Sequence, residues 1–162
     1  MHPRTRTIQL LVPMLMLLAG VLSGSAQTRS NDVAVVVNPA APVSDLSLSE
    51  ARKIFRGDKQ YWSKDLPIVL LVRNPPSRER DVILKQLYSM TEAEFKQYWI
   101  AKIFRAEATS GPKIVYSNSM AADLVKVIPG AIAFMSARDV NPALKVVKID
   151  GHLPGDPQYP LR

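Results

Sequence analysis

Two residue types that often bind anions stand four positions apart in the stretch VRNPPSRERD. Arg73 follows the apolar run PIVLLV, so its guanidinium would project from a strand end and could fork two N–H bonds to one oxyanion. Ser77 stands where the next helix should begin, and it would offer its hydroxyl beside the backbone N–H groups of Arg78 and Glu79. The same spacing also fits an ordinary connection, in which Ser77 only caps the helix and water solvates Arg73. These residues alone leave both interpretations open.

Catalytic chemistry has little support in the sequence. Between residues 27 and 162 the one histidine is His152, which lies in a tail rich in Pro and Gly. A catalytic triad needs its histidine on a rigid element. No His, Cys or acidic spacing fits a metal site, and the glycine motifs that hold phosphates or dinucleotides do not occur. We therefore expect no enzyme, no metal and no cofactor.

The first 26 residues are typical of a secretory signal peptide. A basic start precedes an apolar run at 8–22 and small residues that end at Ala26, which predicts cleavage before Gln27. The alternative is a retained membrane anchor, but the run is shorter than the roughly 20 residues that a spanning helix needs. The mature chain is thus expected in the periplasm, without stable membrane insertion.

Composition narrows the class of partner. The chain has 162 residues, 47% hydrophobic and 22% charged, which suits one globular domain. Its formal charge of +7 becomes +5 without the signal peptide, because that segment holds two arginines and no acid. This charge favours anions, whereas scattered basic residues and few aromatic residues make nucleic acid an unexpected partner. There is no cysteine, so a core without disulfides must hold the domain together.

Apolar strands alternate with helices along the chain, which predicts an α/β domain. Strands are expected at 33–38, 66–73, 113–117, 130–136 and 144–149, and helices at 47–57, 77–90, 91–104 and 118–128. Because the strands are apolar throughout, we expect a mixed, mainly parallel sheet that helices cover on both faces.

Two of the helices carry strong local signals. Ser47 with Glu50, and Thr91 with Glu94, have the spacing of a capping box at a helix start. Gly57 should end the first of these helices. The apolar face of the second is expected to consist of Phe95, Tyr98, Trp99 and Ile103.

Three blocks of the sequence also occur together, in the same order, in a known family. AVVVNPAAPVSDLSLSEARKIFRGDKQYW is similar to a block that reads Val-Asn-Pro…Leu-Thr…Ile-Phe-x-Gly…Trp, and VIPGAIAF to Pro-Gly-Ala-Ile-Gly-Tyr. Between them that family has its ligand loop, an arginine, three residues and then Ser-Gly-Thr, which falls on Arg73 and Ser77. The chain thus resembles the phosphate ABC-transporter substrate-binding proteins over roughly residues 33–149.

The resemblance implies a single lobe of a periplasmic binding protein-like (type II) fold. The expected layout is a flexible tail at 27–32, the α/β domain at 33–150 and an irregular tail at 151–162. The ligand would be phosphate or a related oxyanion, bound through Arg73, Ser77, Arg78 and Glu79.

The chain also departs from the family in two ways. Arg78 and Glu79 replace the Gly-Thr of the ligand loop, and the Glu79 carboxylate would repel a phosphate dianion if it turned inward. Nothing in the sequence corresponds to the family's other lobe. One lobe offers half a cage open to water, where each charged contact is weaker.

Two functions of different class follow. The first is an exported module, related to phosphate ABC transport, that binds phosphate or a related oxyanion, either weakly on its own or completed by a second copy or an envelope protein. The second is an envelope interaction module that keeps the fold without the ligand. The second rests on the missing lobe and on aromatic segments around Trp62 and Trp99, although both tryptophans also suit a core.

Overall fold

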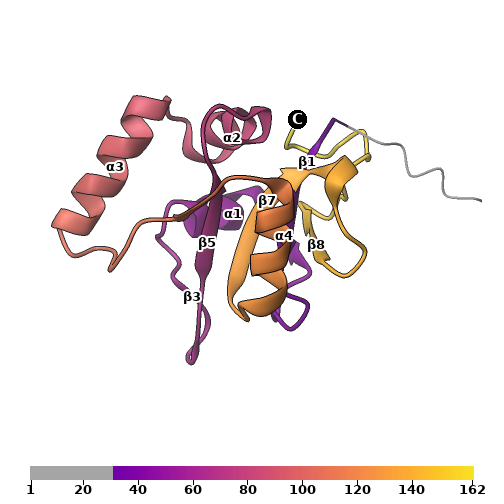
Figure 1. Cartoon of the computed structure of the whole chain (residues 1–162), viewed down its shortest axis with the longest axis horizontal. Helices are drawn as coiled ribbons and strands as arrows, with labels where there is room; N and C mark the ends of the chain where they lie inside the picture. The colour runs from indigo at the N-terminus through magenta and orange to yellow at the C-terminus, as the bar shows by residue number, and fades with distance from the viewer. Residues whose placement is uncertain (1–30) are drawn as a thin grey trace, which may run out of the picture.

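The computed structural model describes residues 31–162, and the expected signal peptide lies outside this range. A six-stranded sheet in the order β2–β8–β1–β7–β5–β6 forms the centre (Figure 1). Its strands are β1 Val33–Val37, β2 Asp45–Leu46, β5 Val69–Arg73, β6 Lys113–Val115, β7 Ala131–Ser136 and β8 Lys145–Ile149. A separate hairpin pairs β3 Tyr61–Ser63 with β4 Leu66–Pro67.

The helices are α1 Leu48–Phe55, α2 Arg78–Ile83, α3 Glu92–Phe104 and α4 Asn118–Val127. A π-helical turn, Leu84–Tyr88, continues α2, and a 3-10 turn, Ala137–Asp139, follows β7. Within residues 31–162, no helix combines the length and the apolar character required to cross a membrane.

The sheet is mixed, as the sequence predicts. Strand β5 runs parallel to both β6 and β7, and β2 runs parallel to β8. Strand β1 is antiparallel to its two neighbours, β7 and β8. Since β5 and β6 are parallel, their carboxyl ends lie at the same edge of the sheet.

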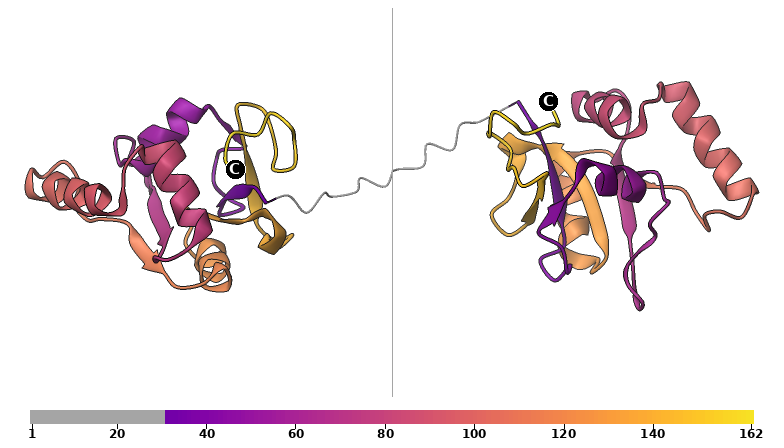
Figure 2. Two further views of the ribbon diagram at one scale, coloured as in Figure 1. Left: turned by 90° about the horizontal axis from the view of Figure 1, so that it is seen from above. Right: turned by 180° about the vertical axis from the view of Figure 1, so that it is seen from behind.

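Both faces of the sheet are covered, which explains why β1 is apolar at every position. Val33, Val35 and Val37 pack with α1, α2 and α3, whereas Ala34 and Val36 pack with α4. Helix α4 lies in front of the sheet in Figure 1, and α1 lies in front of it in the right-hand view of Figure 2, which is seen from behind. The expected α/β layering is confirmed.

The predicted helix caps are confirmed. Ser47 Oγ accepts from Glu50 N at 3.1 Å, and Glu50 Oε2 accepts from Ser47 N at 2.9 Å. The Glu50 carboxylate accepts hydrogen bonds from both Ser47 N and Ser47 Oγ, and these lower its pKa. Thr91 and Glu94 form the same box at the start of α3. Gly57 follows α1 with φ +70°, a backbone conformation that favours glycine. A Cβ at this position would also lie 2.7 Å from the Trp99 ring, which is a second reason for glycine.

Gly130 joins two sequence blocks that lie far apart in the chain. Its carbonyl accepts from Trp62 Nε1 at 3.1 Å and from Val69 N at 2.9 Å. A Cβ at Gly130 would fall 1.8 Å from Pro67 O, so the backbone of β4 occupies that space. The glycine of PGAIAF is therefore needed for a close crossing of two chain segments.

Two expectations about the helices are wrong in detail. The helix expected at 77–90 is α-helical only to Ile83 and then widens into the π-helical turn. Ile103, expected on the buried face of α3, is 43% exposed. Helix α3 projects beyond the sheet (Figure 1), so its outer end has no layer to pack against. Strands β2 and β3 were not expected, since two or three residues leave no periodic pattern.

The two ends of the described chain pack against each other. Val33 N donates to Leu161 O at 2.9 Å, and Tyr159 OH donates to Val33 O at 2.8 Å. Tyr159 and Leu161 are buried although residues 151–162 contain no named strand or helix. Asp32 is buried as well, and its carboxylate accepts from Gly155 N at 2.7 Å.

We predict that Gly130→Ala destabilises the protein by about 2 kcal/mol or more, because an added methyl group must displace the Pro67 carbonyl. Gly111→Ala is the matched control, since the nearest atom to its added Cβ is a side-chain carbon of Ile103 at 3.7 Å. That control should change stability by less than about 1 kcal/mol. Urea unfolding of both variants measures the difference, and equal midpoints would contradict the close crossing.

Candidate oxyanion site

The site begins at the carboxyl end of β5. Arg73 is the last residue of that strand and pairs in register with Val115 of β6. Side chains alternate along a strand, and Leu71 packs with α4 whereas Val72 packs with α1 and α2. The Arg73 side chain therefore leaves the sheet on the α4 face.

Two of the three nitrogens of the Arg73 guanidinium have no partner among the described residues. Its Nε and Nη1 atoms are hidden from solvent, and neither donates a hydrogen bond within residues 31–162. A strand-end arginine usually reaches water, so hidden donors are unexpected here. Hidden N–H groups of a charged side chain cost free energy unless an acceptor meets them.

The structure places Ser77 at the head of α2, as predicted. Its Oγ accepts from Arg80 N at 3.2 Å, so the serine caps the helix. The first backbone bond of the helix runs from Asp81 N to Ser77 O at 3.1 Å, which leaves the N–H groups of Arg78 and Glu79 ahead of it. Arg78 is exposed and Glu79 half-buried. No hydrogen bond joins Ser77 to the Arg73 guanidinium.

Arg80 is the residue of this loop that the sequence did not single out. It is 2% exposed, and its Nη1 donates to Arg73 O at 2.6 Å. Its Nε and Nη2 donate to the two carboxylate oxygens of Glu92 at 2.8 and 3.0 Å. The guanidinium also stacks over the Phe95 ring, 4.6 Å from its centre. Arg80 thus ties the end of β5 to the start of α3.

The ion pair with Arg80 favours the ionised form of Glu92. The hydrogen bonds from Arg80 hold the pKa of Glu92 below its ordinary value, although burial works in the other direction. Sequence spacing could not reveal the pair, because twelve positions separate the two residues and both stand among other charges. A buried arginine in a bidentate ion pair with a carboxylate has its hydrogen-bond donors used, so it is not free to bind a ligand.

The turn between β6 and α4 lies beside Arg73. Ser117 caps α4, with its Oγ accepting from Met120 N at 2.9 Å. Asn118 Nδ2 donates to Asp139 Oδ2 at 2.6 Å, while its Oδ1 is hidden and without a partner. This side of the sheet edge therefore holds two side chains with unmet hydrogen-bonding capacity, Arg73 and Asn118.

Of the tryptophans in the aromatic segments, Trp99 belongs to the core and the half-buried Trp62 packs against it. Trp99 is 6% exposed and packs on Phe95 and Tyr98, and Trp62 donates to the Gly130 carbonyl. His152 lies beside Asp156, with Nδ1 to Oδ2 at 3.0 Å. Among the described residues no group of three His, Cys, Asp or Glu side chains could hold a metal.

The family can now be assigned. Residues 29–158 match the model of the PBP superfamily domain. The chain belongs to that family. The assignment confirms the resemblance expected from the three sequence blocks, at the level of the superfamily.

Solved structures of substrate-binding proteins share the fold. One is described as a phosphate ABC transporter substrate-binding protein with bound phosphate from Clostridium perfringens (24% identity, TM-score 0.61). Others are an ABC-type phosphate transport receptor from Vibrio cholerae (23%, 0.61) and PstS from Borrelia burgdorferi (15%, 0.59). Each match covers 76% of this chain but only 46%, 48% and 49% of the solved chains. This PBP domain therefore spans less than half of each, as a single lobe does.

We predict that Glu92→Gln destabilises the protein by about 1–3 kcal/mol at neutral pH, because buried Arg80 loses its anionic partner. Since the folded pKa of Glu92 is lowered, its contribution is full above the ordinary value of 4.5 and is lost as the pH falls through the folded value. The gap between variant and wild type should therefore close in acid, as measured by urea unfolding across pH.

Glu107→Gln is the control for that experiment. Glu107 pairs with Arg105 on the surface, so its loss should change stability little at any pH. A Glu92→Gln effect that does not depend on pH, or that Glu107→Gln equals, would contradict the buried pair.

Proposed function

We propose that this chain is an exported binding module, not an enzyme, that binds phosphate or a related oxyanion weakly. The observation that carries the proposal is the Arg73 guanidinium, with Nε and Nη1 hidden and unpartnered. An oxyanion is the ligand that a planar guanidinium recognises best, because two parallel N–H groups can meet two oxygens. The relatives named as phosphate-binding proteins support phosphate as the anion and phosphate ABC transport as the setting.

The loop after β5 would supply the remaining contacts. Ser77 would offer its hydroxyl, and the N–H groups of Arg78 and Glu79 open the first turn of α2. Arg80 holds the Arg73 carbonyl and so fixes the backbone of this loop. The positive formal charge of the chain favours the approach of an anion.

The affinity should be low for two reasons. The described residues correspond to one lobe, and water screens an anion that only one lobe contacts. The Glu79 carboxylate also stands in the ligand loop, where the relatives' motif has threonine. A second copy or an envelope protein that covered the site would raise the affinity by excluding water.

The proposed location is the periplasm. The N-terminal 26 residues have the composition of a signal peptide, which would leave a mature chain from Gln27 with a short tail at 27–32. The binding domain would then be residues 33–150, with the tail at 151–162 packed along β1 through Tyr159 and Leu161.

A second candidate function rests on the outer end of α3. Ile100 is 60% exposed and Phe104 is 91% exposed, one helical turn apart on the same face. Exposed apolar side chains on a projecting helix favour protein contact. If the ligand has been given up, the chain would be an envelope interaction module that docks through this helix.

We predict that phosphate raises the thermal midpoint of the protein and that Arg73→Leu abolishes the rise. At about 100 times the dissociation constant the gain for the wild type is roughly 2.7 kcal/mol. Without phosphate, Arg73→Leu should be as stable as the wild type or more stable, because it removes a charge whose hidden donors have no partner. Differential scanning calorimetry at constant ionic strength measures both effects.

Arg105→Ala is the matched control, since it also removes one positive charge but lies at the far end of α3. It should keep the phosphate response. A response that survives in Arg73→Leu, or is equal with chloride, would sink the oxyanion proposal and favour the interaction module.

A further inference from the structure

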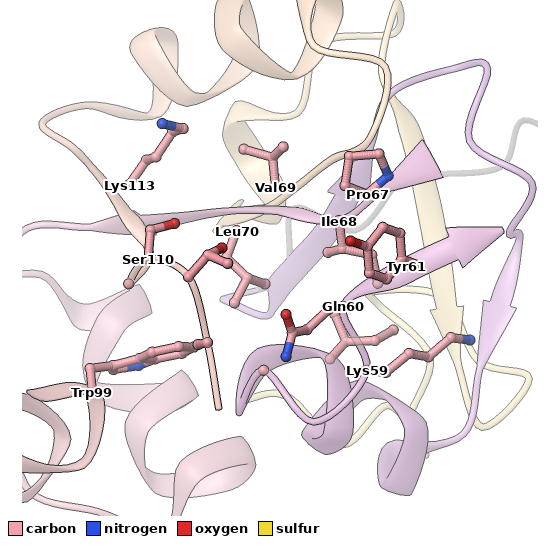
Figure 3. Close-up of a pocket in the computed structure, with 15 residues that line it drawn as sticks. Lys59, Gln60, Tyr61, Pro67, Ile68, Val69, Leu70, Trp99, Ser110 and Lys113 are labelled. Carbon is pink, nitrogen blue, oxygen red and sulfur yellow. The ribbon is translucent and has the colours of Figure 1, made fainter. Parts of the chain in front are cut away.

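A hollow lies beside Val69 and Leu70 (Figure 3), at the start of β5, whereas Arg73 ends that strand. It has a volume of about 150 Å³, and its walls come from the end of α1, the segment 59–61, the start of β5, α3 and the loop 108–111. Nothing in the proposed oxyanion site reaches it, because Arg73 and Ser77 are at the carboxyl end of the strand. The two sites therefore share no residue.

One side of this cavity is apolar and well fixed. Ile54, Ile68 and Leu70 line it together with the Trp99 indole. The Trp99 indole packs directly against Gly57 at the end of α1, because glycine has no Cβ that would collide with the ring. A space of this volume is large enough for a benzene-sized ring.

The other sides are polar and carry only positive charge. Of the 15 lining residues none is acidic, whereas Lys59 and Lys113 stand at opposite ends of the cavity (Figure 3). The Lys59 ammonium lies over the Trp62 ring, 5.9 Å from its centre. Lys113 makes no ion pair with any described residue, and the Ser110 hydroxyl lies between it and Trp99 in the close-up.

We propose that this cavity binds a small aromatic carboxylate. The ring would rest against Trp99 and Leu70, where offset or edge-to-face packing is favourable. The carboxylate would face Ser110, which can donate one hydrogen bond, and Lys113, which supplies the charge. This site goes beyond the proposed oxyanion function and does not depend on it.

Both halves of the ligand are needed in this arrangement. A ring alone would bury apolar surface but would leave Lys113 without an anionic partner. A carboxylate alone would bury no apolar surface and would stay in solvent. For a ligand of benzoate's size the expected dissociation constant is on the order of millimolar.

The test uses benzoate as the probe, with benzamide and acetate as the neutral and ringless comparisons. Saturation-transfer NMR and tryptophan fluorescence of the purified chain should show saturable binding of benzoate, about threefold weaker binding of benzamide at low salt, and none of acetate. An excess of phosphate at constant ionic strength should not displace benzoate, since the oxyanion site is separate.

Two variants make the result specific to this cavity. Ser110→Trp fills the space and should abolish benzoate binding. Lys113→Gln removes the positive charge of an exposed side chain and should remove the preference for benzoate over benzamide. Arg73→Leu should leave benzoate binding unchanged. Absence of saturable benzoate binding to the wild type, or an unchanged preference in Lys113→Gln, would overturn the proposal.

Discussion

The buried guanidinium of Arg80 is the interaction on which the loop after β5 depends. It satisfies the Arg73 carbonyl, both carboxylate oxygens of Glu92 and the face of Phe95 at once. Taking such a charge out of water is expensive, and only a complete set of partners offsets that cost. Once Arg80 is fixed, the end of β5 and the starts of α2 and α3 are fixed with it. The position of the Arg73 backbone follows from this constraint.

Arg73, seven positions before Arg80, shows the opposite situation. Its backbone is held, but the N–H groups that its side chain hides have no acceptor in the described chain. Natural proteins rarely leave buried donors unmet, so each exception calls for an explanation such as a bound ion, an ordered water or a functional role. Arg80 in α2 therefore has a full set of partners, whereas two Arg73 donors at the end of β5 have none among the described residues.

Local chemistry explains why much of the fold could be predicted. The capping boxes at Ser47 and Thr91 and the uniformly apolar β1 act through neighbours in sequence or through a single burial rule, so they can be recognised without coordinates. The antiparallel direction of β1 and the exposure of Ile103 depend on which elements lie next to them, and no short pattern carries that information.

The candidate site divides in the same way. Arg73 and Ser77 were expected at a strand end and a helix start because their residue types and spacing suit those positions, and both lie there. The role of Arg80 was missed because a run of alternating charges is usually a solvated helix face. Only the pairing with Glu92 across the loop shows that one of these charges is interior.

Oxyanion binding at Arg73 can be followed directly through the NMR signal of its Nε–H group during a phosphate titration, with the signal assigned through Arg73→Leu. If the hidden donors receive an oxyanion, that resonance shifts and saturates with phosphate, while the Arg80 Nε–H signal, already bonded to Glu92, stays in place. An Arg73 signal that does not respond, or one that moves no more than that of surface Arg105, would contradict oxyanion binding at this loop.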